Sequence, residues 1–262
     1  MTRLTDHHAL ITGGGTGIGA AIARALAREG AKLTLVGRRR DKLEEVAASC
    51  SPAMAGARQG SGSRPSPGHL VAPADITVRA QVDRAFDLAR QTQGPISLLV
   101  NNAGAAAGIA FAKVTPEIWS DMLAVNLDGM FHCCQAALPD LLEAPAGRIV
   151  TVASMAGLHG FAYASPYIAA KHGAVGLTRA LAAEFARTTL RVNAVCPGFV
   201  DTEMTVQSVS NIKAKTGRSE DEARAELARL NPSGRLITPE EVAAAVLDLV
   251  LSERNGEALE IA

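Results

Sequence analysis

The chain has 262 residues, with 26 basic and 26 acidic side chains, 48% apolar residues, 24 glycines and only 3% aromatic residues. This length can bury a sizeable core without disulfides or metal, and at about 150 residues per domain it allows one large or two small domains. The balanced charge and scarce aromatics argue against a binder of nucleic acids or acidic membranes, which normally carries a basic face or stacking rings.

Short aliphatic segments alternate with longer segments of helical periodicity along almost the whole chain. We expect strands at residues 8–12, 32–36, 70–72, 97–100, 148–153, 192–196 and 258–261, and helices at 17–29, 41–49, 78–93, 116–142, 166–187 and 239–251. This alternation is typical of a parallel sheet with helices on both faces. Because it crosses the middle of the chain without a linker, the sequence predicts a single α/β domain of doubly wound, Rossmann type.

Two segments interrupt the alternation. Residues 49–68 are rich in glycine, proline and serine, and we expect a flexible surface insertion there. Residues 201–235 are polar and longer than a tight connection, with a short helix expected at 220–230. Long ordered excursions are often lids, so we expect this segment to cover a substrate.

The four cysteines, Cys50, Cys133, Cys134 and Cys196, form no C-x-x-C pair, and no long apolar segment marks a signal peptide or a membrane helix. We therefore expect reduced thiols and a cytoplasmic protein. Cys133 and Cys134 fall in an apolar helix, which favours buried inert thiols over redox chemistry. The six histidines lack ligand spacing, so no metal site is expected.

A glycine-rich loop follows the first expected strand and precedes a helix. Glycine lets the backbone approach a ligand, and the N-terminus of the next helix offers free N–H groups and a partial positive charge for a pyrophosphate. The spacing is G-x-x-x-G-x-G instead of G-x-G-x-x-G, and the alternative is a mobile turn. The expected phosphate contacts are Gly13, Gly15, Thr16, Gly17, Ile18 and Gly19.

The second expected strand ends in Gly37, followed by three arginines. Folds that prefer NAD usually place a carboxylate here for the ribose 2′-hydroxyl. Guanidinium groups instead bind a 2′-phosphate, so Arg38 and Arg39 favour NADP(H). The alternative is that these arginines are only the solvent-exposed basic start of a helix.

Tyr167 and Lys171 are spaced by one helical turn and would share a helix face. A nearby cation favours the phenolate form of tyrosine, which suits proton transfer. The pair alone is only suggestive, because a tyrosine and a lysine can take this spacing by chance.

Further motifs stand in order along the chain: Asn101-Asn102-Ala103-Gly104, Ser154 thirteen residues before Tyr167, and Pro197-Gly198 after the sixth expected strand. Together with the glycine loop and Lys171, they resemble the short-chain dehydrogenase/reductase family over essentially the whole chain. The segment from Tyr167 to Met204 looks most similar to the 3-oxoacyl thioester and polyketide ketoreductase members. The resemblance implies a seven-stranded parallel sheet of order 3-2-1-4-5-6-7.

The resemblance also implies a catalytic set of Asn126, Ser154, Tyr167 and Lys171. Tyr167 would exchange a proton with the carbonyl oxygen, Ser154 would hydrogen-bond that oxygen, and Lys171 would bind the nicotinamide ribose and lower the pKa of Tyr167. Asn126 would hold a water in a proton relay; without the family it would be an ordinary helical asparagine. Tyr167 and Lys171 would also contact the cofactor. The other implied cofactor contacts, beyond the phosphate loop and the arginines, are Asp75, Ile76, Asn102, Ala103, Gly104, Pro197, Gly198, Val200 and Thr202.

The substrate pocket is less defined by the sequence. His159, Tyr163, Phe199 and Met204 flank the catalytic segments and would line the pocket, or they could be packing residues. The function that we expect is NADP(H)-dependent interconversion of a ketone and a secondary alcohol, with a 3-oxoacyl thioester as one candidate substrate. The alternatives are an NAD-dependent hydroxyacyl or secondary-alcohol dehydrogenase and a non-catalytic dinucleotide sensor or scaffold. Family habit implies a homotetramer.

Overall fold

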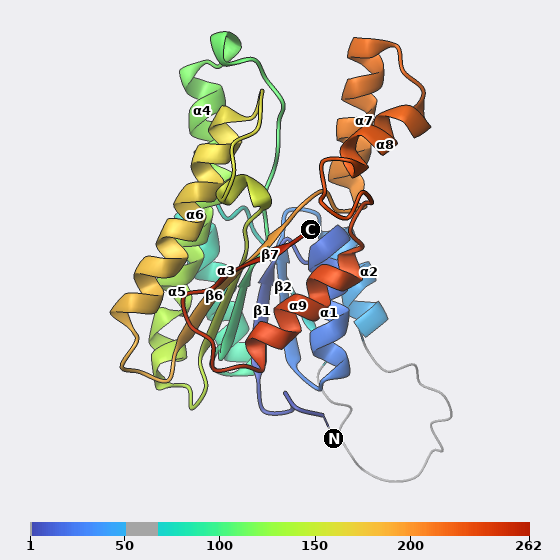
Figure 1. Ribbon diagram of the computed structural model, residues 1–262. Helices are drawn as coiled ribbons and strands as arrows, with labels where there is room; N and C mark the ends of the chain where they lie inside the picture. Colours follow the sequence, from blue (N-terminus) through green and yellow to red (C-terminus); the bar gives the residue numbers. More distant parts are fainter. Residues whose placement is uncertain (1, 51–67) are drawn as a thin grey trace, which may run out of the picture.

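Parallel strands form one sheet at the centre of the protein (Figure 1). A computed structural model describes residues 2–50 and 68–262, and within them the sheet has seven strands in the order β3-β2-β1-β4-β5-β6-β7. The strands are β1 (His8–Thr12), β2 (Lys32–Gly37), β3 (Leu70–Pro73), β4 (Leu98–Asn101), β5 (Arg148–Val152), β6 (Arg191–Pro197) and β7 (Ala258–Ile261). This confirms the predicted single α/β domain and its strand order.

The position of β1 between β2 and β4 fixes where a ligand can bind. The chain extends the sheet from β1 through β2 to β3 and then returns to add β4 on the other side of β1. In such sheets the crevice for a dinucleotide lies beyond the carboxyl ends of the strands, where the order reverses. Every residue of β1 and β5 is buried, as expected for strands that are covered on both faces.

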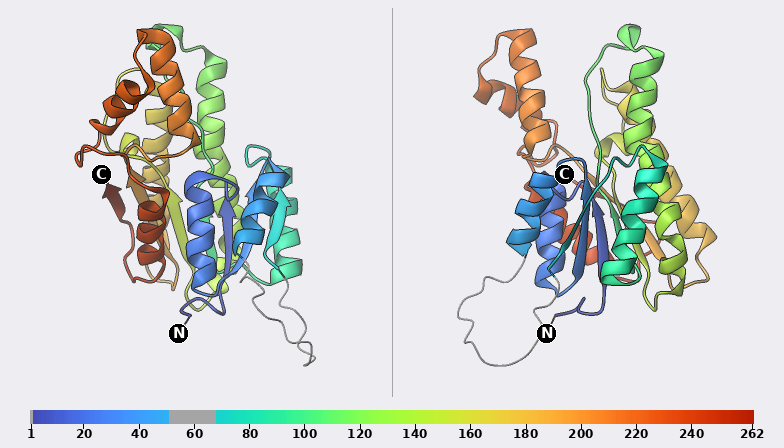
Figure 2. Two further views of the ribbon diagram at one scale, coloured as in Figure 1. Left: turned by 90° about the vertical axis from the view of Figure 1, so that its right-hand side faces the viewer. Right: turned by 180° about the vertical axis from the view of Figure 1, so that it is seen from behind.

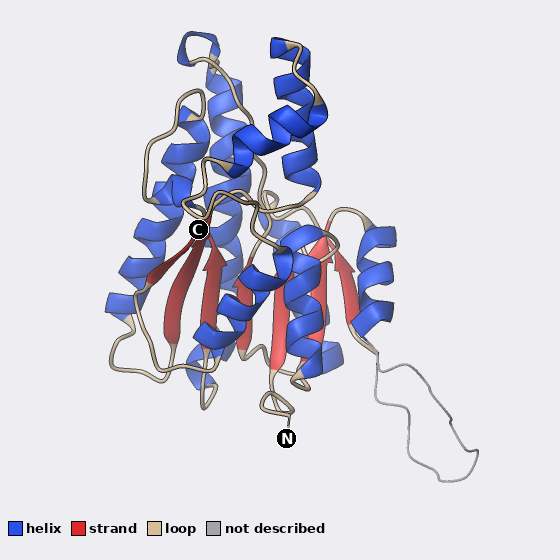
Figure 3. Ribbon diagram, turned by 45° about the vertical axis from the view of Figure 1, so that its right-hand side comes forward, coloured by secondary structure: helices blue, strands red, loops and turns tan. Residues whose placement is uncertain are grey.

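Helices cover both faces of the sheet (Figures 1 and 3). One face carries α1 (Gly17–Arg28), α2 (Arg40–Cys50) and α9 (Pro239–Val250), whose apolar side chains share one core cluster. The other face carries α3 (Arg79–Gln93), α5 (Gly129–Glu143) and α6 (Ser165–Glu184) around Phe86 and a second cluster. The two layers hold the strand ends, and hence the loops beyond them, in fixed positions.

The expected helix 116–142 is interrupted by a π-helical turn. The structure has α4 (Pro116–Leu123), the π turn η2 (Ala124–Asp128) and then α5. Pro139 lies inside α5, and the helix continues past it to Glu143. The sequence pattern predicted the helical content of this region but not the change of pitch.

The segment 201–235 contains more structure than the sequence predicted. It forms α7 (Glu203–Thr216), which was not expected, and α8 (Glu220–Ala228), which ends two residues before the prediction. Both helices rise beyond the carboxyl ends of the strands, on the opposite side from α4 (Figures 1 and 2). The predicted insertion 49–68 begins later than expected, because residues 49 and 50 belong to α2; its part from 51 to 67 lies outside the described residues.

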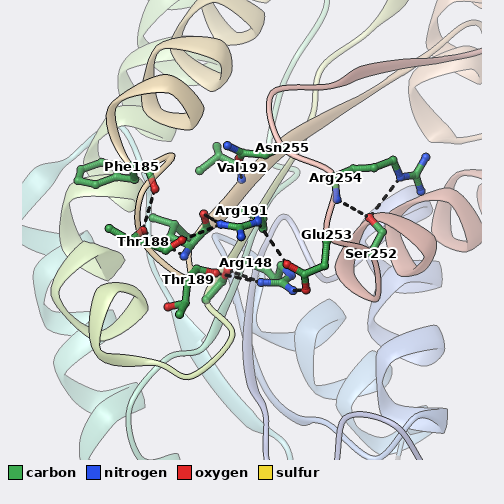
Figure 4. A network of polar contacts seen from close by, with 12 residues as sticks. Arg148, Phe185, Thr188, Thr189, Arg191, Val192, Ser252, Glu253, Arg254 and Asn255 are labelled. Atoms are coloured by element: carbon green, nitrogen blue, oxygen red, sulfur yellow. Dashed lines mark hydrogen bonds and ion pairs between the residues drawn. The ribbon is translucent and has the colours of Figure 1, made fainter.

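A buried arginine anchors the opposite end of the sheet (Figure 4). Only 6% of the Arg148 side chain is exposed, and it donates to the Val250 carbonyl at 3.1 Å and the Thr189 carbonyl at 3.2 Å. Its Nη2 also pairs with Glu253 at 2.7 Å, and Arg191 reaches the second oxygen of that carboxylate at 3.3 Å. The start of β5 is thereby tied to β6, to the end of α9 and to the turn before β7.

Candidate active site

The glycine loop between β1 and α1 is closely packed against the backbone around it. Gly13 has φ +65°, and a Cβ there would lie 2.8 Å from Asn102 Nδ2. A Cβ at Gly19 would lie 2.2 Å from the Gly13 carbonyl oxygen. Thr16, the N-cap residue of α1, makes no side-chain capping hydrogen bond, so the first N–H groups of the helix stay open to an anion. The loop therefore fits a pyrophosphate, with Gly15 and Gly17 on the same turn and Ile18 packed against the core.

Thr12 and Asn102 join this loop to the loop after β4. The Thr12 hydroxyl accepts hydrogen bonds from the Asn102 N–H at 3.0 Å and the Ala103 N–H at 3.1 Å. Asn102 Nδ2 donates back to the carbonyls of Thr12 at 3.0 Å and Gly13 at 3.2 Å. Asn102 and Ala103 were predicted to contact the cofactor, whereas Thr12 had no predicted role.

Arginines stand at the end of β2 as predicted, and they differ in their partners. Arg38 is exposed and makes no hydrogen bond or ion pair with any residue that the structure describes. Arg39 Nη2 lies 3.4 Å from Thr16 Oγ1 and 3.3 Å from Glu203 Oε2. Arg38 is thus available to an anionic ligand, whereas Arg39 connects the glycine loop to α7.

Asp75 and Ile76 follow β3 beside these arginines. The Asp75 carboxylate accepts from the Thr77 N–H at 2.9 Å and from its hydroxyl at 2.8 Å. The hydrogen bond from the Thr77 backbone is the main reason that the pKa of Asp75 is lowered, and the charge of Arg38 adds to it. Ile76 is buried, and its side chain fills the space that Gly129 leaves free, so that a Cβ there would lie 2.6 Å from Ile76 Cδ1.

The predicted catalytic side chains come together between β5 and α6. Ser154 caps the short 3-10 helix η3 (Met155–Gly157), accepting from the Ala156 N–H at 3.1 Å. Tyr167 lies in the first turn of α6, and Lys171 follows one turn later. The Lys171 ammonium donates to the Val152 carbonyl at 3.0 Å and lies 5.7 Å from the centroid of the Tyr167 ring.

The electrostatics of this group differ from the expectation. Burial raises the pKa of Tyr167, and a hydrogen bond with the Ser154 side chain lowers it in part. Lys171 is only 5% exposed, and burial lowers its pKa to about 8. Burial thus dominates the pKa of Tyr167 in the protein alone, and the expected lowering by Lys171 stays a prediction. The physical reason is the burial of the phenol itself, which disfavours the ionised form.

Asn126 lies in the π turn and faces Gly104. Its Oδ1 accepts from the Ala105 N–H at 3.3 Å, and its Nδ2 donates to the Ala105 carbonyl at 2.9 Å. A Cβ at Gly104 would lie 2.8 Å from Asn126 Oδ1 and 3.6 Å from Lys171 Nζ. Gly104 therefore allows the amide and the ammonium to approach the same space.

A small cavity of about 10 Å³ lies behind Lys171, lined also by Thr12, Asn101, Asn126 and Thr151. Asn101 is 5% exposed, and its Oδ1 has no hydrogen-bond partner among the described residues. A polar cavity of this size can hold one water molecule.

The expected nicotinamide segment leaves β6 and crosses to the start of α1. Gly198 donates its N–H to the Ile261 carbonyl at 2.8 Å, and the Thr202 hydroxyl donates to the Val200 carbonyl at 3.4 Å. The methyl group of Thr202 lies 3.2 Å from the position of a Cβ at Gly17. Pro197 ends β6, so the predicted residues 197, 198, 200 and 202 all lie along one edge of the site.

The four expected pocket residues have different surroundings. His159 Nε2 lies 3.3 Å from Glu260 of β7. Tyr163 is 69% exposed, has φ 63°, and its carbonyl accepts from Ile109 at 2.7 Å. Met204 is exposed at the start of α7, whereas Phe199 packs against the apolar cluster of α7 and α8. The packing alternative is thus favoured for Phe199, and the pocket roles of the other three stay predictions.

Asn231 is the other site residue that the sequence analysis missed. It is buried beside Gly198 and bonds the backbone of Phe199 through both ends of its side-chain amide. Phe199 lies 32 residues away, so the local sequence around Asn231, which is typical of a polar turn, does not predict this contact.

The described residues contain no group of three or more His, Cys, Asp or Glu side chains that could hold a metal ion. Among residues 2–50 and 68–262, no helix has the length and apolar character needed to cross a membrane. Cys50, Cys133, Cys134 and Cys196 are free thiols. Burial raises the pKa of Cys196, which lies close to Lys171, to about 11, so this thiol is neutral at physiological pH.

Comparison with known proteins identifies the family. The family model for short chain dehydrogenase matches residues 7–213. The chain belongs to this family. It is therefore an oxidoreductase that uses a nicotinamide dinucleotide and interconverts CH–OH and carbonyl groups.

Several relatives resemble this short-chain dehydrogenase over most of its length. A putative ketoacyl reductase of Streptomyces coelicolor is 37% identical over 92% of this chain and 89% of the relative. The D-beta-hydroxybutyrate dehydrogenase of Cupriavidus necator is 36% identical, also over 92% of this chain and 89% of the relative. Among solved structures, a variant of actinorhodin polyketide ketoreductase with NADPH is similar at TM-score 0.87 and 33% identity, covering 97% of this chain and 95% of that one. Levodione reductase is similar at TM-score 0.87 and 33% identity, covering 99% and 97%.

Proposed function

We propose that this dehydrogenase uses NADP(H) to interconvert a ketone and a secondary alcohol. The observation that carries the choice of cofactor is Arg38, an exposed guanidinium at the end of β2 that makes no hydrogen bond or ion pair with any described residue, although the Asp75 carboxylate is close enough to feel its charge. A carboxylate at this place would repel a 2′-phosphate, whereas a free guanidinium binds it with two parallel hydrogen bonds. The NADPH in the structure of the related ketoreductase supports the same choice.

The residues present fit such a cofactor at each of its parts. The glycine loop with the open N-terminus of α1 would hold the pyrophosphate, and Asp75 and Ile76 would flank the adenine. Ala103 and Gly104 would lie beneath the adenosine ribose, while Lys171 would bind the nicotinamide ribose. Val200 and Thr202 would bind the carboxamide. When bound, the nicotinamide supplies or accepts the hydride.

The chain's own residues would handle the proton. Tyr167 donates its phenolic proton to the carbonyl oxygen during reduction and accepts it during oxidation. Ser154 donates a hydrogen bond to the same oxygen and stabilises the charge that develops there. The one-water cavity behind Lys171, next to Asn126, supports a relay that returns a proton to the phenol. The raised pKa of Tyr167 keeps the phenol protonated, which suits the reductive direction.

The decisive experiment compares kcat/KM for NADPH and NADH in the wild type and in Arg38→Asp. We expect the wild type to prefer NADPH and the variant to reverse the preference, because the new carboxylate repels the 2′-phosphate and can bind a 2′-hydroxyl. Arg40→Asp is the matched control, since Arg40 already pairs with Glu44 at 3.4 Å on α2. A wild type that prefers NADH would overturn the cofactor assignment.

We propose a 3-oxoacyl thioester as the first candidate substrate, supported by the similarity to relatives that are named putative ketoacyl reductases. The similarity to D-beta-hydroxybutyrate dehydrogenase supports a second candidate, an NAD-dependent hydroxyacyl or secondary-alcohol dehydrogenase. Assays with acetoacetyl thioesters, with free 3-oxo acids and with simple cyclic and acyclic ketones, each with both cofactors, distinguish them.

A dinucleotide sensor or scaffold without catalysis is the alternative from another class. It would bind NADPH yet reduce no ketone of that panel, and Tyr167→Phe would leave its cellular role unchanged. Assembly as a homotetramer and a cytoplasmic location stay predictions; light scattering tests the first and fractionation of the source cells the second.

A further inference from the structure

Asn231 lies after α8, near the end of the segment 201–235, and is only 2% exposed. Its Oδ1 accepts a hydrogen bond from the Phe199 N–H at 2.8 Å. Its Nδ2 donates to the Phe199 carbonyl at 2.9 Å and to the Arg235 carbonyl at 2.6 Å. The side-chain amide thus binds both polar groups of one residue in the segment that follows β6.

Gly198 is shaped by this contact. A Cβ there would lie 2.2 Å from Asn231 Oδ1 and 3.1 Å from Asn231 Cγ. Its φ is not in the left-handed region. Glycine is therefore needed here to admit the side chain of Asn231, and not to allow an unusual backbone conformation.

Other backbone groups of this segment are bonded to residues near the start of α9. Phe199 O accepts a second hydrogen bond from Ile237 at 3.0 Å, and Asp201 donates to the Ile237 carbonyl at 2.8 Å. The N–H of Val200 has no partner among the described residues. The proposed function places Val200 at the nicotinamide carboxamide, and this N–H is a donor that Val200 could offer there.

We propose that Asn231 is a positioning residue for the nicotinamide end of the cofactor. It holds the Phe199 peptide in place, so that the Val200 N–H remains directed at the nicotinamide carboxamide. It acts through Phe199 and does not itself touch the cofactor. The inference rests on the proposed cofactor site. Removing the amide leaves the Phe199 N–H and the Arg235 carbonyl without their partners, and the segment must rearrange to satisfy them, because buried unpaired groups are costly.

The test compares two probes that share the adenosine part of the cofactor. NADPH contains the nicotinamide, whereas adenosine 2′,5′-bisphosphate does not, and calorimetry gives the affinity of each. For Asn231→Val we expect NADPH binding to weaken by about tenfold or more, the loss of one to two buried hydrogen bonds. Binding of adenosine 2′,5′-bisphosphate should change by less than about twofold, because the glycine loop and Arg38 are untouched.

Two further variants keep the outcome interpretable. Asn211→Val is the matched control, because Asn211 is exposed on α7 and Gln207 is the one described residue that hydrogen-bonds its side-chain amide. Asn231→Asp retains an acceptor for the Phe199 N–H but can donate to the carbonyls only when protonated. We therefore expect its loss of NADP⁺ affinity, relative to the wild type, to shrink as the pH is lowered from 8 to 5. If Asn231→Val does not fold, the pH dependence of Asn231→Asp tests the proposal in its place.

The outcomes separate the two proposals. If the wild type binds neither probe, the proposed function fails. If the wild type binds both probes and Asn231→Val binds them as tightly, or loses both equally, the proposed function stands and the positioning role of Asn231 is wrong.

Discussion

Arg39 and Glu203 form an ion pair of 3.3 Å that joins the end of β2 to the first residue of α7. The same guanidinium lies 3.4 Å from the hydroxyl of Thr16 in the glycine loop. A side chain expected to bind the cofactor therefore also contacts the helix expected to cover the substrate.

This pair gives the first prediction. Glu203 competes with a 2′-phosphate for Arg39, so Glu203→Gln should raise the ratio of kcat/KM for NADPH over NADH. Both side chains are largely exposed, and such pairs contribute at most about 1 kcal/mol, so we expect a change of about two- to fivefold. The double variant Arg39→Ala/Glu203→Gln should show no further gain over Arg39→Ala alone.

Tyr167→Phe should abolish turnover and leave cofactor binding intact. The substitution removes only the phenolic oxygen, and loss of a general acid costs about 10²- to 10⁴-fold in kcat. NADPH affinity by fluorescence should stay within about twofold, since the ring and its packing remain. Turnover close to that of the wild type would exclude Tyr167 as the proton donor.

Lys171 should make reduction sensitive to pH near its own pKa of about 8. Above this pH the ammonium loses its proton, ribose binding weakens, and kcat/KM for ketone reduction should fall. The guanidinium of Lys171→Arg does not titrate in this range, so any activity that this variant retains should lack the decline. A rate of reduction that rises between pH 7 and 9 in the wild type would contradict this assignment.

The same buried cation should also reduce stability at neutral pH. The folded pKa of about 8 is below the usual value of 10.5, so the folded state binds fewer protons between these values and stability rises with pH there. Below pH 8 the desolvated charge costs up to about 3 kcal/mol. Lys171→Met should therefore raise Tm by a few degrees at pH 7. The gain is reduced by the stability that is lost when the Val152 carbonyl has no hydrogen-bond donor, and it should vanish above about pH 10.5. A lower Tm at pH 7 would contradict this account.

Gly104→Ala should impair catalysis without unfolding the protein. The added methyl group would displace the Asn126 amide, which lies 2.8 Å from its position, and crowd Lys171. Gly176→Ala, in the exposed part of α6, is the control. Outside its own helical turn, a Cβ added there would meet no atom of the described residues within 4 Å, so the variant should stabilise the protein by about 0.5–1 kcal/mol. Denaturant unfolding and steady-state rates of both variants check the pair.

The sequence predicted those parts of the fold that depend on a local pattern of residues. Buried strands of a parallel sheet are continuous apolar segments, so the strand positions were found to within one or two residues. The glycine loop and the Tyr167–Lys171 spacing are local in sequence, and α6 brings both side chains to one face. These parts of the site needed no knowledge of distant contacts.

The features that were missed depend on contacts between distant residues. Most side chains of α7 are polar or exposed, so its sequence lacks the apolar stripe that marks a helix. Asn231 has partners that only the folded chain brings near. The pKa of Tyr167 is raised by burial of the phenol, and a spacing of four residues between Tyr167 and Lys171 does not report burial.

The π turn at Ala124–Asp128 sets the rotational phase between α4 and α5. It adds one residue to a single turn, so the side chains on either side differ in direction by about 100° from those of an unbroken α-helix. Deleting one residue from this turn would remove the extra residue and its step of about 100° together, so a regular helix would form and α4 and α5 would keep their relative orientation. The change would fall on the turn itself, which carries Asn126 and its hydrogen bond to the Ala105 carbonyl, while the helices on either side would stay as they are.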